Sequence, residues 1–202
     1  MSKKLLLKFK SSRSLSENLW PTRKITSKQK LILFKIRKRK LSHFGLKLQA
    51  KRALSILYGK LSYSEYNKTR EEASKLQGKI GNNFMFLLEK RLDSVIYRMN
   101  ICPTFRSGKQ LILHENVFVN NKLVNVPSYP LKPGDIISIA PKNPKTFQSL
   151  VEKSLKNLKD NRNCSAKPLH LEINYKSLCA IFLYPPQQLF HSYELDINIL
   201  TQ

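Results

Sequence analysis

The sequence predicts an α+β protein in which a mainly helical part is followed by a small antiparallel sheet. Apolar residues recur at helical spacing over residues 46–57 and again over 84–99. Residues 117–139 are rich in β-branched side chains and contain Asn-Asn and Pro-Gly turn signals, a pattern typical of a hairpin followed by another strand. No apolar run approaches the roughly 18–20 residues that span a bilayer, so we expect no membrane partner.

Positive charge is concentrated in the first third of the chain. The 202 residues include 37 Lys and Arg against 13 acids, a formal net charge of +24, and residues 1–60 hold 18 of these cations with the single acid Glu17. Such a field attracts polyanions, nucleic acid first and anionic membrane second. We therefore expect residues 1–41 to form a basic RNA-binding tail that is largely disordered until RNA neutralises it.

The first sixteen residues, MSKKLLLKFKSSRSLS, are basic, contain serine and lack acids, as mitochondrial transit peptides do. We interpret them instead as a native basic tail. The abundance of Lys, Asn, Ile, Leu and Phe indicates an AT-rich genome, and a gene encoded in an organelle needs no transit peptide. This composition therefore fits an organelle-encoded gene.

Residues 27–41, SKQKLILFKIRKRKL, carry seven cations and no acid. The segment could be helical, and its charges could simply be solvated. Mutual repulsion among them favours a bound polyanion. The candidate RNA-binding residues of this segment are Arg37, Lys38, Arg39 and Lys40.

Two helices are predicted next. Leu46 to Leu57 follow helical spacing and Gly59 is a suitable stop. This helix carries the candidate RNA-binding residues Lys47, Lys51 and Arg52. Ser62 and Glu65 have capping-box spacing and predict a second helix that ends near Gly78.

The apolar stripe from Phe84 to Met99 predicts one amphipathic helix that begins at Asn82 or Asn83. Arg91 falls within the stripe, where a buried charge requires a partner. It either pairs with an acid or reaches out to a ligand, and the sequence leaves both open. We interpret Asp93 as an acid on the helix surface.

Thr104 is a plausible N-cap for a short helix that ends at His114. Arg106 and Lys109 share one side of this helix, and both are expected to be exposed. Gly108, on another side, costs helix stability relative to alanine. Close approach of a neighbouring backbone is one reason to accept that cost.

The predicted sheet begins with a strand over residues 117–119, an Asn120-Asn121 turn that tolerates positive φ, and a partner strand over 123–126. A turn at 133–134 leads into a strand over 136–139. Val119 is expected to face inward. Asp135 is interpreted as a structural turn residue.

No metal, cofactor or catalytic site is expected. The three cysteines, Cys102, Cys164 and Cys179, lack CxxC spacing, and the four histidines are scattered, so reduced structural thiols are favoured over zinc ligands. The sequence contains no P-loop, dinucleotide fingerprint or nucleophile elbow. We therefore do not expect an enzyme.

Two consecutive stretches, LLEKRLDSVIYRM and TFRSGKQLILHENVFVNNKLVNVPSYPLKPGDIISI, resemble the RNA-binding domain of the small-subunit ribosomal protein four family. Further similarity lies in SENLWPTRK, LSHFGLKLQAKRALSILYG and PLHLEINYKSLCAIFLYPPQQ. The chain departs from the family pattern at Asn121, where the hairpin glycine is usual, and at Ser107, where an acid is usual. The cysteine cluster of some bacterial members is absent, and residues 142–167 match nothing in the family.

The resemblance implies four segments: the tail at 1–41, the N-terminal part of a helical domain at 42–84, an inserted S-four-type domain at 85–141, and a segment at 142–202 that completes the helical domain. In the inserted domain two helices pack on a small sheet. The resemblance places four cations on or near its RNA-facing side, namely Arg91, Arg106, Lys109 and Lys122.

The function implied is that of a structural constituent of the mitochondrial small ribosomal subunit, and the resemblance favours a mitochondrial, organelle-encoded protein over a plastid or bacterial one. Such a protein binds small-subunit rRNA early in assembly and lies near the path along which mRNA enters, beside ribosomal protein five. The alternative is a free RNA-binding protein with an S-four-type domain, or a subunit of an RNA-modifying enzyme, because similar domains accompany catalytic domains in pseudouridine synthases and tyrosyl-tRNA synthetases.

Overall fold

The computed structural model describes residues 26–35, 42–102, 104–140 and 168–184, together with Phe9, Arg13, Leu15, Val151, Glu152 and Pro186. The chain divides into two compact units, one formed by residues 1–62 and 190–202 and the other by 63–189. Within the described parts, no helix has both the length and the apolar character that a bilayer crossing requires.

In the first unit, helices α2 (Ser27–Lys35) and α3 (His43–Leu57) are described. The hydroxyl of Ser42 caps α3 by accepting a hydrogen bond from the Gly45 N–H at 3.3 Å, and Gly59 follows the helix with a φ of 66°. Leu15 lies 2% exposed against Ala53, and the Gln49 side-chain amide donates to the Leu15 carbonyl at 3.3 Å. The tail was expected to become ordered only on RNA. Its described part nevertheless includes helix α2 and the buried side chain of Leu15.

The second unit begins with α4 (Tyr63–Lys75) and α5 (Ile80–Glu89), which pack on each other. The rings of Tyr66 and Phe84 meet edge to face with their centroids 5.3 Å apart. The Asn83 amide donates to the carbonyls of Leu76 and Gln77 at 3.1 and 3.2 Å, which satisfies backbone groups at the end of α4.

The expectation of a single helix from Phe84 to Met99 is wrong. Helix α5 ends at Glu89 and α6 (Leu92–Arg98) begins after Arg91, whose φ of −69° and ψ of 141° are extended. The loop at 127–131 explains the break, because the Leu92 N–H donates to the Tyr129 carbonyl and the Leu131 N–H to the Lys90 carbonyl, both at 2.9 Å. These tertiary bonds replace the helical ones that the apolar stripe alone would allow.

Helix α7 (Phe105–Leu113) starts as predicted, with the Thr104 hydroxyl accepting from the Ser107 N–H at 3.2 Å. Gly108 faces α6: a Cβ built on it would lie 3.5 Å from Ile96 Cγ2 and 3.7 Å from the Asp93 carbonyl oxygen. The two helices therefore approach closely at Gly108, as the sequence suggested. These are ordinary contact distances, so the approach does not exclude a methyl group.

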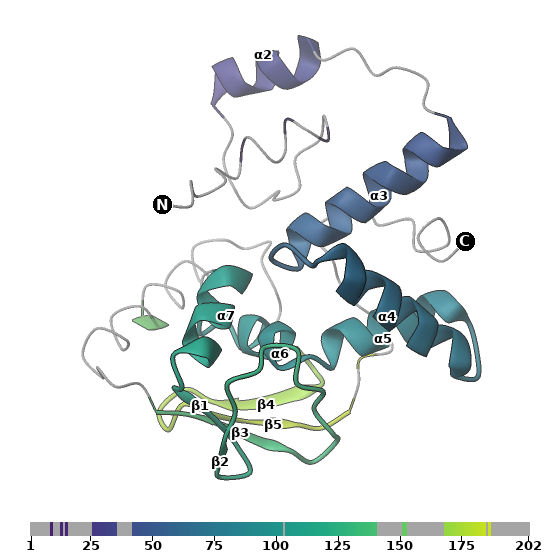
Figure 1. The fold of residues 1–202 in the computed structure, drawn as a ribbon. Helices are drawn as coiled ribbons and strands as arrows, with labels where there is room; N and C mark the ends of the chain where they lie inside the picture. Colours follow the sequence, from purple (N-terminus) through teal and green to yellow (C-terminus); the bar gives the residue numbers. More distant parts are fainter. Residues whose placement is uncertain are drawn as a thin grey trace. The chain divides into compact units, whose positions relative to one another are not determined.

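A five-stranded antiparallel sheet completes the second unit (Figure 1). Its strands, in spatial order, are β2 (Lys122–Leu123), β1 (Val117–Val119), β3 (Ile136–Ile139), β5 (Cys179–Phe182) and β4 (Leu171–Asn174). The hairpin turn has positive φ at Asn120 and Asn121, as predicted, although β2 is shorter than expected. Residues 142–202 were expected to complete the helical domain. Of that segment, β4 and β5 extend this sheet, whereas residues 190–202 group with residues 1–62.

Helices α6 and α7 lie over one face of the sheet (Figure 1). Between these layers lies the main core, where Ile96, Ile112, Val117 and Ile137 are completely buried. Val119 is 3% exposed and faces inward, as predicted. The sheet thus holds the two helices from behind. Residues 92–96 of α6 are all buried, so the exposed side chains of this helix pair lie on α7.

Candidate nucleic-acid interface

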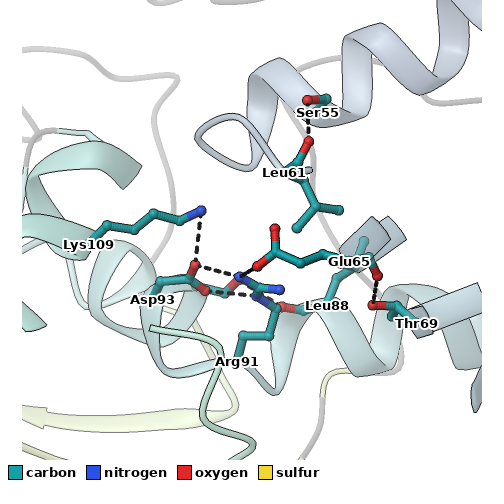
Figure 2. A network of polar contacts seen from close by, with 9 residues as sticks. Ser55, Leu61, Glu65, Thr69, Leu88, Arg91, Asp93 and Lys109 are labelled. Atoms are coloured by element: carbon teal, nitrogen blue, oxygen red, sulfur yellow. Dashed lines mark hydrogen bonds and ion pairs between the residues drawn. The ribbon is translucent and has the colours of Figure 1, made fainter. Parts of the chain in front are cut away.

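Arg91 is buried and paired, which resolves the two alternatives that its position in the apolar stripe left open. Its Nε and Nη2 atoms contact the two carboxylate oxygens of Asp93 at 3.1 and 3.0 Å, and Nη2 lies 3.5 Å from Oε1 of Glu65 (Figure 2). Burial alone would lower the pKa of Arg91, but hydrogen bonding and attraction to Asp93 and Glu65 outweigh it and raise the pKa above the ordinary value. Only 7% of Arg91 is exposed.

Asp93 is not the surface acid that the sequence suggested, because it is only 2% exposed. It occupies the first turn of α6, where the helix dipole favours a negative charge. Its backbone N–H donates to the Pro127 carbonyl at 3.1 Å, which ties it to the loop that interrupts the helices. The sequence reading failed because Arg91 and Asp93 face the same side once the helix is broken between them.

Lys109 joins the same cluster from α7. Its ammonium nitrogen lies 3.5 Å from Oδ2 of Asp93, and 20% of its side chain is exposed (Figure 2). The prediction of a freely exposed Lys109 therefore needs correction. The cluster brings together two of the predicted RNA-binding cations, Arg91 and Lys109, around one buried carboxylate.

Arg106 and Lys122 are exposed, on α7 and on the hairpin respectively. The hairpin is held by a polar clamp in which the Asn120 side chain donates to Asp135 Oδ1 at 2.9 Å and accepts from the Ile136 N–H at 3.0 Å. Asp135 also accepts from the Lys132 N–H at 2.7 Å, which confirms its structural role in the turn. The clamp fixes the backbone that carries Lys122.

The remaining predicted cations belong to the first unit or lie outside the described residues. On α3, Lys47 and Lys51 are partly exposed and Arg52 is exposed. Arg37, Lys38, Arg39 and Lys40 fall outside the described part of the chain.

A second buried ion pair, between Glu89 and Arg98, was missed. Glu89 is fully buried, and its two carboxylate oxygens accept from Arg98 at 2.7 and 3.0 Å. The residues lie nine positions apart, a spacing that pairs no side chains on a continuous helix, so only the break between α5 and α6 brings them together.

His170 is 6% exposed and precedes β4. Its Nε2 atom is buried and finds no hydrogen-bond partner among the described residues. Burial lowers its pKa below the ordinary histidine value and nearby Arg98 lowers it further, against an opposing effect of Glu89. His170 is therefore neutral near pH 7.

No group of three His, Cys, Asp or Glu side chains within the described ranges could hold a metal ion. Burial raises the pKa of the Cys102 thiol to about 11, so this thiol stays protonated at neutral pH. Cys179 is partly exposed, and Cys164 lies outside the described residues.

Comparison with known proteins confirms the resemblance drawn from the sequence. Residues 90–137 match the S4 domain family. The chain is 38% identical over 197 residues to the small ribosomal subunit protein uS4m of Marchantia polymorpha, covering 96% of this chain and 97% of that protein. It is 34% identical over 197 residues to uS4 of Caulobacter vibrioides, covering 93% and 90%, and 46% identical over 106 residues to uS4 of Brevibacillus brevis, covering 52% and 53%. With its α+β architecture and near full-length similarity, this chain belongs to the uS4 family of small ribosomal subunit proteins.

Proposed function

We propose that this chain is a structural constituent of the mitochondrial small ribosomal subunit and binds small-subunit rRNA. The observation that carries the proposal is that some cations of the S4 domain are paired with carboxylates and others are exposed. Arg91 and Arg98 are paired with buried carboxylates, whereas Arg106 and Lys122 in the same domain are exposed. Family membership and the similarity to a mitochondrial uS4 support the same reading.

Binding in this proposal is electrostatic. Exposed Lys and Arg contact phosphates and release counterions, while the paired helices fit the shape of a folded RNA. Arg106 and Lys122 contribute from the S4 domain, and Arg52 with Lys47 and Lys51 contributes from α3. The basic segment at 37–40 adds further phosphate contacts. The chain needs no chemistry of its own for this role, and we propose no catalytic site.

The finer parts of the proposal rest on family resemblance. We infer that the protein binds rRNA early in subunit assembly and lies beside ribosomal protein five, near the path along which mRNA enters. From the composition, which fits an AT-rich genome, we also infer that its gene is encoded in the organelle.

Sedimentation tests the proposal. The endogenous protein should migrate with the mitochondrial small subunit in a sucrose gradient and stay there at moderate salt. The purified chain should bind a small-subunit rRNA transcript with an affinity that falls steeply as salt rises. A protein found only in light fractions, away from ribosomal particles, would instead indicate a free RNA-binding protein or a subunit of an RNA-modifying enzyme.

A further inference from the structure

The two cations on Asp93 are not equivalent. Arg91 makes two short contacts, 3.1 Å to Oδ1 and 3.0 Å to Oδ2, which engage both carboxylate oxygens. Lys109 lies 3.5 Å from Oδ2, an oxygen that Arg91 already contacts. A bidentate guanidinium–carboxylate pair is the stronger arrangement, so Arg91 by itself neutralises Asp93.

The two cations also differ in their access to solvent. The Arg91 side chain is 9% exposed, whereas 20% of the Lys109 side chain is exposed. Lys109 sits on a flexible four-carbon stem, and its helix is anchored through the contact of Gly108 with α6. The ammonium of Lys109 can therefore turn outward without any movement of α7, whereas the Arg91 guanidinium is enclosed.

We propose that Lys109 is an exchangeable cation, which leaves Asp93 for a phosphate oxygen when RNA binds while Arg91 stays in place. Asp93 is then a positioning residue: it holds the Lys109 ammonium at the edge of the α6–α7 layer before RNA arrives. This inference rests on the proposed rRNA binding and specifies which of the two clustered cations reaches the RNA.

Lys109 can leave Asp93 and Arg91 cannot, because only Arg91 can neutralise the buried carboxylate by itself. When Lys109 leaves, Asp93 keeps the bidentate Arg91 contact, and the buried carboxylate remains compensated. If Arg91 left, Asp93 would be buried with a single long contact to Lys109, an arrangement that strongly disfavours a buried charge. RNA therefore gains one phosphate contact from this cluster.

The first test compares Lys109→Met with Arg106→Met, because both replace a cation on α7 by an uncharged, unbranched side chain. Binding of an in vitro small-subunit rRNA transcript is measured over a range of salt concentrations. Lys109→Met should lower the slope of log affinity against log salt by roughly 0.7 to 0.9, the contribution of one phosphate contact. It should leave the cooperative melt of the protein in place, since Arg91 still neutralises Asp93.

The second test removes the competing carboxylate. Asp93→Asn should raise RNA affinity by roughly two- to fivefold, the factor for a partly exposed ion pair that no longer has to open. The salt slope should stay at the wild-type value, because the number of phosphate contacts is unchanged. Glu65→Gln is the matched control: it removes a carboxylate that lies 3.5 Å from Arg91, and it should change neither affinity nor slope.

If Lys109→Met binds RNA with the wild-type salt slope, the exchange is overturned, because Lys109 then stays on Asp93 in the complex. This holds whatever the slope of Arg106→Met. Weaker RNA binding by a folded Asp93→Asn protein also overturns it. If Asp93→Asn loses its cooperative melt, the salt slope of Lys109→Met alone decides whether Lys109 exchanges. Failure of the wild-type chain to bind the transcript in a salt-dependent way would refute the proposed function instead, and this result is separate from either variant.

Discussion

Arg91 and Arg106 carry the same side chain in opposite surroundings. Arg91 is 7% exposed between two carboxylates at the start of α6, and Arg106 is exposed on α7. The first guanidinium links α6 to α4 through Asp93 and Glu65; the second is exposed and can meet a polyanion. The contrast shows that in so basic a protein a cation's role depends on whether a carboxylate has been buried beside it.

Removal of Arg91 should have the largest effect. Arg91→Met leaves Asp93 buried with one contact at 3.5 Å, and loss of one partner from a buried pair costs about 3–5 kcal/mol. The free energy of unfolding from urea denaturation measures this loss. Arg106→Met is the control and should change stability by less than about 0.5 kcal/mol. Equal changes in the two variants would mean that the Asp93 cluster does not stabilise the fold.

His170 extends the comparison to a buried polar group: its Nε2 atom has no hydrogen-bond partner among the described residues. An unsatisfied buried atom costs about 1–3 kcal/mol, so His170→Phe, which places an aromatic ring near Phe182, should stabilise the protein by about 1 kcal/mol at pH 7.5. His170→Gln, which keeps a polar group there, should not. A destabilised phenylalanine variant would mean that Nε2 has a partner in solution.

The same residue predicts a pH dependence. Because burial lowers the pKa of folded His170, the unfolded chain takes up the proton more readily. The part of the free energy of unfolding that depends on neutral, buried His170 is fully present above the unfolded pKa of about 6.5. It is lost as the pH falls toward the folded pKa. His170→Phe should remove this part of the loss of stability at low pH. Thermal melts of the wild type and the variant at pH 7.5 and 5.5 measure the difference.

A substitution at Gly108 changes the packing of α6 and α7 without changing any charge. A methyl group at this position would meet Ile96 at 3.5 Å, an ordinary contact, and alanine is the better helix former. Gly108→Ala should therefore raise stability by about 0.5–1 kcal/mol without changing the salt slope of RNA binding. Destabilisation would show that α6 and α7 lie closer together in solution.

Lys122 should show the smallest change in stability. It is exposed beside the clamped hairpin turn, so Lys122→Met should leave stability within about 0.5 kcal/mol. If Lys122 contacts rRNA, the salt slope should fall by roughly 0.7 to 0.9. A shift in melting temperature as large as that of Arg91→Met would remove the distinction between exposed and buried cations.

Local signals in the sequence predicted the parts of the fold that local chemistry determines. Asn120 and Asn121 tolerate the positive φ of a tight turn, and Thr104 caps α7, so the hairpin and the short helix could be placed. The break at Arg91 could not, because it depends on hydrogen bonds to a loop about forty residues further along the chain. The apolar stripe across Phe84 to Met99 fits a continuous helix equally well.

The candidate site was predictable only in part, for the same reason. The sequence identified the cations Arg91, Arg106, Lys109 and Lys122, but their exposure depends on which carboxylates fold in beside them. Asp93 becomes a buried partner only after α5 and α6 separate, and Glu89 meets Arg98 by the same rearrangement. Periodicity along one helix carries no information about such pairs.

The strand order has a consequence for synthesis of the chain. Strand β3 pairs on one side with β1 but on the other with β5, so its second edge stays open until the ribosome has made residues 179–182. Unpaired edges invite pairing with other chains, and contacts between distant segments form slowly. Phe182, a fully buried core residue, arrives with the same strand. A chain terminated early therefore keeps an open core and a free edge, and it is exposed to aggregation and proteolysis from which the finished protein is protected.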